Sequence, residues 1–218
     1  MGNQAGVAGP GWHAPDPSDL VFDPDAGGLA GRPLRADARR NYGKLVAAAK
    51  EVFAKYGGDA SMEAIAKEAG VGAGTLYRHF PKRIDVVEAV YRTDVDQLVV
   101  LARTAAAELG PWEGLDAWLH AFVRYAQGKR TFLNELQEAF EKNPQLKVSA
   151  RERIEEAAGI VLARAQRAGL ARDDIDGADL MALIGPMCRN ATLSEDQGER
   201  LLTMVLAGLR PPSAQAAP

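Results

Sequence analysis

Apolar residues recur along this chain at intervals of three and four, the spacing that places them on one side of an α-helix. One such run covers residues 37–56, and two short runs, residues 61–69 and 73–80, lie on either side of Gly70. No stretch shows sustained alternation of apolar and polar residues, which is the pattern of a half-buried strand. The sequence therefore predicts an all-α protein.

Longer helices are expected over the rest of the chain. A helix of residues 81–109 follows the short pair, and Asp37 is expected to cap the first helix. Asp176 is expected to cap a later helix, and Ser194 with Gln197 has the spacing of a capping box. The remaining helices are expected over residues 112–127, 130–141, 148–168, 177–190 and 195–209.

The breaks between these runs divide the chain into four segments. Residues 1–31 hold much of the chain's Gly and Pro and are expected to form a flexible tail. Residues 32–92 would form a three-helix domain. The long helix would lead from it into a second helical domain, residues 93–210, and residues 211–218 would be a C-terminal tail.

The two short helices have the pattern of a helix-turn-helix. Gly70 can adopt the left-handed conformation that ends a helix, which other residues adopt only at a cost. Ala66 is small enough for two helices to cross closely over a short turn. In the second helix Leu76 and Phe80 would face inward, which leaves the polar side chains between them on the outside.

These outward side chains suit a DNA backbone. Thr75 and Tyr77 offer hydroxyl donors, while Arg78 and His79 offer N–H donors. The second helix begins with residues of almost no bulk, which would let it enter a major groove. The predicted DNA contacts are Arg35, Arg39, Arg40, Ser61, Ala73, Gly74, Thr75, Tyr77, Arg78, His79, Lys82 and Arg83. The alternatives are an ordinary helical hairpin in a core and, for the first three arginines, a solvated helix start rather than a basic arm.

Residues 39–91, with GVGAGTLYRHFPKRIDVVEAVY at their centre, resemble the DNA-binding domain of the tetracycline-repressor (TetR) family. The resemblance is weaker over residues 94–210. It implies an N-terminal helix-turn-helix DNA-binding domain, joined by a long helix to a C-terminal helical ligand-binding and dimerisation domain. Arg83 stands where the family usually has a lysine, so the charge is kept. Gly72 stands where a capping serine is frequent.

The resemblance also implies roles for single residues. Thr75, Tyr77 and His79 match positions at which the family contacts phosphate. Ala73 and Gly74 match positions near base edges. The partner would be a palindromic double-stranded DNA operator, bound by a homodimer.

Charge and cysteine content bear on the binding partner and on the cellular compartment. The net charge is -3, but residues 31–93 carry 12 Lys and Arg against 7 Asp and Glu, and local charge is what meets phosphate. Cys188 is the only cysteine, so no internal disulfide can form. No apolar run approaches the roughly 18 residues that cross a bilayer, and no signal-peptide pattern opens the chain. We expect a cytoplasmic protein without a membrane partner.

Two features of the second domain acquire a meaning through the resemblance. Apolar stripes on the last two helices would build a dimer interface from Leu180, Leu183, Ile184, Leu202, Val205, Leu206 and Leu209. The alternative is packing within one subunit. Aromatic residues would line a pocket for a small effector, made by Trp112, Trp118, Phe122, Tyr125, Phe132, Leu136, Phe140 and Met187. A filled core needs such residues equally.

Signals for catalysis or metal binding are weak. The glycines of residues 70–74 resemble a dinucleotide loop, but Thr75 stands where the third glycine belongs. The acidic residues of 171–179 resemble a calcium loop that Ala178 interrupts. We expect no enzyme, no cofactor and no metal. The function expected is a ligand-responsive transcriptional repressor, released from its operator by a small apolar or amphipathic effector. The alternatives are a helical small-molecule enzyme and an interaction adaptor.

Overall fold

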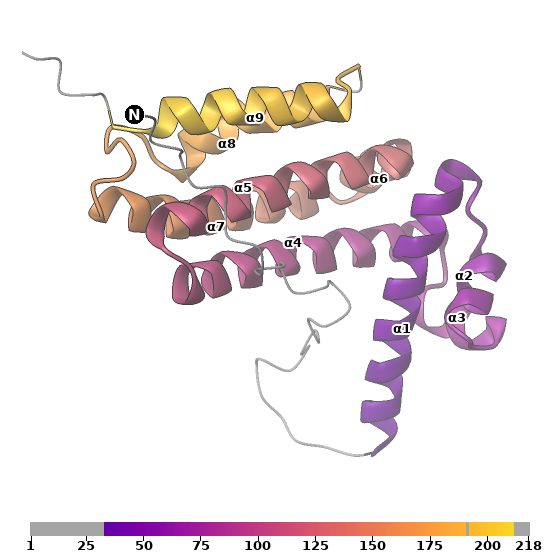
Figure 1. Ribbon diagram of the computed structural model, residues 1–218. Helices are drawn as coiled ribbons and strands as arrows, with labels where there is room; N and C mark the ends of the chain where they lie inside the picture. Colours follow the sequence, from indigo (N-terminus) through magenta and orange to yellow (C-terminus); the bar gives the residue numbers. More distant parts are fainter. Residues whose placement is uncertain (1–32, 191, 212–218) are drawn as a thin grey trace, which may run out of the picture. The chain divides into compact units, whose positions relative to one another are not determined.

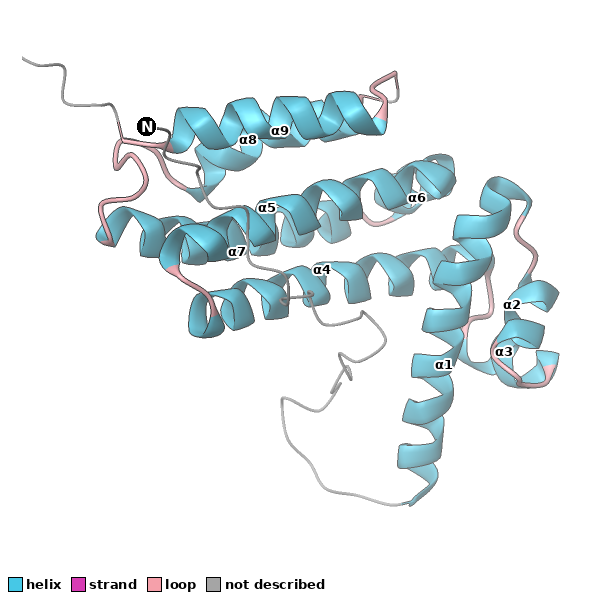
Figure 2. Cartoon of the chain, in the orientation of Figure 1, coloured by secondary structure: helices cyan, strands magenta, loops and turns pink. Residues whose placement is uncertain are grey.

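The computed structural model describes residues 33–190 and 192–211, and these ranges contain helices and no strand (Figures 1 and 2). The predicted all-α class is therefore confirmed. The elements are α1 (Pro33–Tyr56), η1 (Gly57–Asp59), α2 (Met62–Glu68), α3 (Ala73–His79), α4 (Arg83–Glu108), α5 (Pro111–Gly128), η2 (Lys129–Phe132), α6 (Leu133–Lys142), α7 (Pro144–Arg167), α8 (Gly177–Arg189) and α9 (Glu195–Leu209).

Contacts divide the described residues into two compact units. Residues 33–97 and 124–154 form one of them, which we call the N-terminal unit. Residues 98–123 and 155–211 form the other, the C-terminal unit. Helices α4, α5 and α7 each contribute to both. The predicted domain boundary after residue 92 stays a prediction.

Several helix starts differ from the predicted ones. Helix α1 begins at Pro33, so Asp37 lies inside it and is not its cap. Proline suits a first helical position because it has no N–H to leave unpaired. Helix α4 begins at Arg83, two residues later than predicted, because the backbone N–H of Lys82 donates to Asp85 Oδ2 (2.8 Å) and closes the first turn there.

The predicted caps of the last two helices are confirmed. Asp176 Oδ1 accepts the N–H groups of Ala178 (2.8 Å) and Asp179 (2.9 Å) at the start of α8. The hydroxyl of Ser194 accepts the N–H of Gln197 (3.2 Å), and the Gln197 side chain accepts the N–H of Ser194 (3.0 Å). Each pair satisfies backbone donors that a helix start leaves free.

Within the N-terminal unit, α1 covers α2 and α3. Ile65 of α2 and Leu76 of α3 are completely buried, and Leu45 of α1 is buried with them. Ala66 is buried as well, as expected for a close helix crossing. Phe80 closes the end of α3 from inside. The inward set that the sequence predicted is therefore correct.

Half-buried charged side chains lie in the same unit. The Lys129 ammonium is 3.4 Å from the centroid of the Tyr125 ring and 4.2 Å from that of Tyr91. Asp94 forms an ion pair with Lys50 of α1. Burial lowers the pKa of Lys129 well below its usual value, raises the pKa of Asp94, and raises the pKa of Tyr91 to about 12.

Within the C-terminal unit, α8 begins directly against α7. A Cβ atom at Gly177 would lie 2.7 Å from the backbone nitrogen of Gly159 and would also meet the carbonyl of Glu155. Real Cβ atoms do not approach backbone so closely. Only glycine permits this contact.

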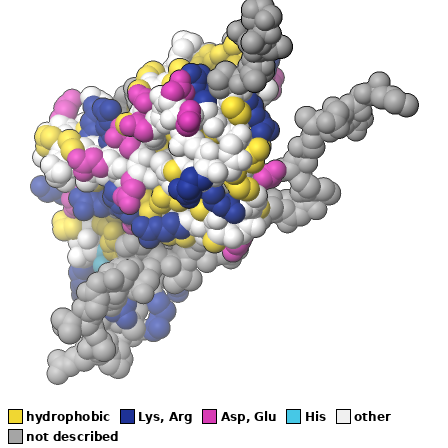
Figure 3. Space-filling view, turned by 90° about the vertical axis from the view of Figure 1, so that its left-hand side faces the viewer, with side chains coloured by type: hydrophobic (Ala, Val, Ile, Leu, Met, Phe, Trp, Pro, Cys, Tyr) yellow, Lys and Arg dark blue, Asp and Glu magenta, His cyan; other side chains and the backbone are white. Residues whose placement is uncertain are grey.

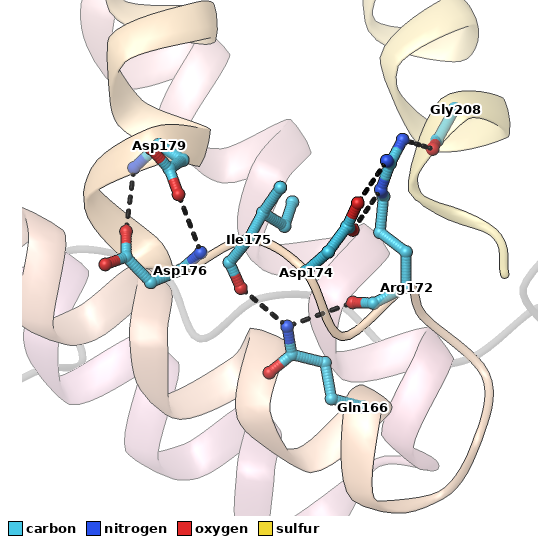
Figure 4. Close-up of polar contacts among 7 residues, drawn as sticks. All are labelled: Gln166, Arg172, Asp174, Ile175, Asp176, Asp179 and Gly208. Atoms are coloured by element: carbon cyan, nitrogen blue, oxygen red, sulfur yellow. Dashed lines mark hydrogen bonds and ion pairs between the residues drawn. The ribbon is translucent and has the colours of Figure 1, made fainter.

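The acidic loop before α8 is held by its own carboxylates (Figure 4). Asp174 accepts two bonds of 2.6 Å from the Arg172 guanidinium, which lowers its pKa. Gln166 of α7 donates to two loop carbonyls, including that of Arg172 (3.0 Å). Asp176 and Asp179 accept backbone N–H groups at the start of α8. Asp176 and Asp179 therefore cap α8, and Asp174 stabilises the loop through Arg172.

Candidate nucleic-acid interface

The turn between α2 and α3 is built from local signals. The Ser61 hydroxyl accepts the N–H of Ala64 (3.0 Å) and starts α2. Gly70 ends that helix with a φ of 65°, in the left-handed region that favours glycine. The N–H of Val71 then donates to the carbonyl of Ala66 (3.0 Å), which fixes the turn. The predicted helix-turn-helix is confirmed.

The start of α3 is bare. Gly72, Ala73 and Gly74 are all exposed, and a Cβ atom at either glycine would find no described atom within 4 Å. The backbone of α3 can therefore approach another surface closely at this point. That is what a helix entering the major groove of DNA requires.

The polar side chains of α3 remain accessible beyond this tip. Tyr77 and Arg78 are exposed, and Thr75 and His79 are half-buried. None of the four is part of the core, although the His79 ring touches Tyr42 of α1, with centroids 6.3 Å apart. A face with hydroxyl, guanidinium and imidazole donors is suited to phosphate oxygens.

Tyr77 has a partner that the sequence did not indicate. Its hydroxyl donates to Glu63 Oε1 of α2 (3.1 Å), and this hydrogen bond raises the pKa of Tyr77. The two residues lie on different helices, so no periodicity within one helix relates them. To donate to a phosphate, Tyr77 would exchange Glu63 for it.

Arg83 differs from its predicted role. Its Nη2 donates to Glu135 Oε1 (2.9 Å) and to the carbonyl of Gly58 (3.2 Å), and its guanidinium lies 5.2 Å from the centroid of Phe53. These contacts hold it inside the N-terminal unit, so the geometry does not support a phosphate contact. The neighbouring Lys82 is exposed.

The predicted basic arm is helical instead. Arg39 and Arg40 are exposed residues within α1, which already begins at Pro33. The side chain of Arg35 lies outside those that the structure describes. Because α1 starts before these three residues, the solvated helix start that the sequence left open describes them better than a basic arm ahead of the helix. Contacts of Arg39 and Arg40 with phosphate stay a prediction.

The residues predicted to line an effector pocket do not gather in one unit. The C-terminal unit holds Trp112, Trp118, Phe122 and Met187, and the N-terminal unit holds Tyr125, Phe132, Leu136 and Phe140. Trp118 is completely buried, its indole N–H donates to the carbonyl of Leu98 (2.9 Å), and its ring stacks on Phe122. Phe132 packs on Phe53 of α1, with centroids 5.3 Å apart.

Core packing, the alternative left open by the sequence, therefore describes Trp118, Phe132 and the buried Leu136 better than a pocket wall. The other five stay predictions. Among them, Trp112 is half-buried beneath the guanidinium of Arg210, which lies 3.5 Å from its ring centroid.

The predicted dimer stripes divide in a similar way. Five of the seven residues are buried within the single chain: Leu180, Ile184, Leu202, Leu206 and Leu209. Packing within one subunit accounts for these five. Leu183 is 60% exposed, and Val205 is half-buried. Met204, which was not predicted, is 69% exposed on α9.

The rest of the described surface shows no metal cluster and no membrane-spanning helix. On the face drawn in Figure 3, acidic and basic side chains are interspersed among apolar ones. Among the described residues, no group of three or more His, Cys, Asp or Glu is placed to hold a metal ion. None of the described helices is both long and apolar enough to cross a membrane.

The fold and the exposed face of α3 together define a helix-turn-helix protein, and family models agree with this class. Residues 45–90 match the model for bacterial regulatory proteins of the tetR family. Residues 110–211 match the C-terminal domain of SbtR-like transcriptional regulators.

Solved structures extend the match over most of the chain. The TetR transcriptional regulator SCO0520 from Streptomyces coelicolor is 38% identical, with a TM-score of 0.70, over 79% of this chain and 99% of that one. A TetR transcription regulatory protein from Mycobacterium vanbaalenii is 36% identical, with a TM-score of 0.64, over 82% of this chain and 99% of that one.

Curated relatives match over a shorter segment. An HTH-type transcriptional regulator of Staphylococcus aureus (strain USA300) is 41% identical over 64 residues, which are 29% of this chain and 35% of that protein. The match thus spans about a third of the length of such relatives. Taken with the solved structures, these similarities show that the chain belongs to the TetR family of transcriptional regulators, which are not enzymes.

Proposed function

We propose that this protein binds double-stranded operator DNA through α3, represses transcription there, and is released by a small molecule. The bare, exposed start of α3 carries the proposal, because Gly72, Ala73 and Gly74 leave its backbone open to a groove. Tyr77, Arg78 and Lys82 follow this tip along the chain and can donate hydrogen bonds to phosphate oxygens. Since its partner is chromosomal DNA, we place the protein in the cytoplasm.

A homodimer would present two copies of α3 to a palindromic operator. Two recognition helices reach successive major grooves when they stand about 34 Å apart. Leu183 of α8 and Met204 of α9 are the large apolar side chains exposed on the last two helices. Exposed apolar groups of this kind favour burial against a second copy, and a two-fold interface would use the same surface twice.

The effector would act by changing which conformation is populated. A ligand releases DNA only if it binds the released conformation more tightly than the DNA-bound one. The family resemblance supports a small apolar or amphipathic effector within the C-terminal helices. Trp112 and Met187, both half-buried in the C-terminal unit, are the candidates for its contacts there.

The proposal is tested by selecting bound fragments from a pool of random duplexes, followed by footprinting of the enriched sequence. We expect a two-fold symmetric site with two protected half-sites about one helical turn apart. Enrichment of no sequence, or binding that tracks net charge alone, would show that the protein does not read an operator.

A further inference from the structure

A groove of about 580 Å³, lined by several polar side chains, opens in the N-terminal unit. Three helices form it: Tyr42 belongs to α1, Arg92 and Asp96 to α4, and Gln145 and Arg153 to α7. Small-molecule sites have volumes of roughly 300–1,000 Å³. None of the eight residues predicted for the effector pocket is among those that line this groove.

Two guanidinium groups line the groove, each paired with a carboxylate, and the carboxylate of Asp96 also lines it. Arg92 donates one bond to Glu88 Oε2 (3.1 Å) and keeps 57% of its side chain exposed. Arg153 pairs with Asp96 and keeps 44% exposed. A guanidinium has five N–H donors in a planar fork that matches carboxylate and phosphate oxygens. Each pairing uses only part of that fork.

The N-terminal end of α7 also contributes to the groove. Gln145, in the first turn of this helix, lines the groove, and that turn contains no acidic residue. A helix start carries a partial positive charge. Thr93 and Ser149 add hydroxyl groups to the lining. Guanidinium N–H donors, hydroxyl groups and a concave shape therefore coincide.

We propose that this groove binds a small organic anion, a molecule with a carboxylate or phosphate group and further hydroxyl groups. The anionic group would lie between the guanidinium groups of Arg92 and Arg153. The hydroxyl groups would contact the polar lining near α7. This is a second ligand site, chemically distinct from an apolar effector pocket.

Tyr42 links the groove to the recognition helix. Its ring lines the groove and also lies 5.2 Å, between centroids, from Phe80 and 6.3 Å from His79. A ligand that moved this ring would act on the end of α3 through one side chain. The coupling to DNA rests on the proposed function, whereas anion binding does not.

Calorimetric titration tests the site without DNA. Inorganic phosphate, citrate and glycerol 3-phosphate are the probes, at constant ionic strength, with glycerol as the neutral control. We expect at least one anion to saturate one site per chain and glycerol not to bind. Gln145→Glu adds a negative charge at an exposed position of the groove, and it should weaken binding at least about tenfold.

The matched control is Gln137→Glu, the same change at an exposed position of α6 outside the groove. It should leave the affinity within about twofold. Arg92→Gln removes one guanidinium group and an exposed ion pair whose loss should cost little stability. It should weaken anion binding as Gln145→Glu does.

Two results would overturn the proposal: no probe saturates below about 10 mM, or Gln145→Glu binds as the wild type does. The coupling is read separately, as a shift in affinity for the selected operator when the anion is present. An unchanged operator affinity with intact anion binding refutes only the coupling. Failure to bind any operator refutes the proposed function, while the titration still decides the groove.

Discussion

The variant Arg83→Met tests whether Arg83 stabilises the fold or contacts DNA. It removes the guanidinium group and keeps most of the aliphatic part of the side chain. The lost contacts are the bond to Glu135, the bond to the Gly58 carbonyl, and the packing over Phe53. The Arg83 and Glu135 side chains are 28% and 20% exposed, so solvent screens the pair in part. We estimate a loss of about 2 kcal/mol, roughly half of it from the ion pair.

For a chain of this length, that loss lowers the melting temperature by about 4–8 °C. Urea unfolding and thermal melting, both followed by circular dichroism, measure it. The matched control is Lys82→Met, which likewise replaces a positive charge by methionine at the exposed neighbouring residue and should leave stability unchanged. A double-mutant cycle with Glu135→Gln should return a coupling of about 1 kcal/mol.

In DNA titrations at several salt concentrations, we expect Lys82→Met to have the larger effect and Arg83→Met the smaller one, the reverse of their effects on stability. Lys82→Met should reduce the slope of log affinity against log salt by about one, and Arg83→Met should leave that slope unchanged. The reasoning is refuted if Arg83→Met melts like the wild type and flattens the slope, because Arg83 would then meet phosphate rather than Glu135.

Three further predictions follow from the packing. The double variant Leu183→Arg, Met204→Arg should be monomeric in sedimentation experiments and keep the helix content of the wild type. Dimers that persist in this variant would show that the interface lies elsewhere. Trp118→Ala should cost about 3–5 kcal/mol in urea unfolding, because the ring is completely buried, and a stable variant that has lost effector response would instead make it a pocket wall. Burial holds the pKa of Lys129 below its usual 10.5, so the unfolded chain binds more protons in alkaline solution and stability should rise as pH increases toward 10.5. Lys129→Met should abolish this rise, and an identical pH profile in the variant would contradict the assignment.

The sequence predicted those parts of the fold whose causes are local. Ser61, Gly70 and Ser194 act within one turn of chain, through a cap or a left-handed φ, and the structure confirms each. The inward positions of α3 follow equally from its spacing. The start of α1 was predicted wrongly, because Asp37 has a side chain suited to a cap and yet lies inside a helix that begins at Pro33.

Partners distant in sequence could not be predicted. Arg83 meets Glu135, 52 residues away, and Tyr77 meets Glu63 on another helix. An apolar stripe shows which side of a helix is covered, but not whether the same chain or a second copy covers it. Leu180 therefore looked like an interface residue and proved to be core, whereas Met204 is exposed outside the predicted set.

The bare tip of α3 is tested most directly by Gly74→Gln, measured as affinity for the selected operator. A side chain at Gly74 would find open space in the free protein, and replacing a helical glycine does not weaken the helix, so stability should be unchanged or higher. Gly128→Gln, at an exposed glycine with similar open space in α5, is the matched control. We expect Gly74→Gln to lower operator affinity at least about 100-fold, to the non-specific level, and the control to bind normally. Wild-type operator affinity in a folded Gly74→Gln variant would contradict the insertion of α3 into DNA.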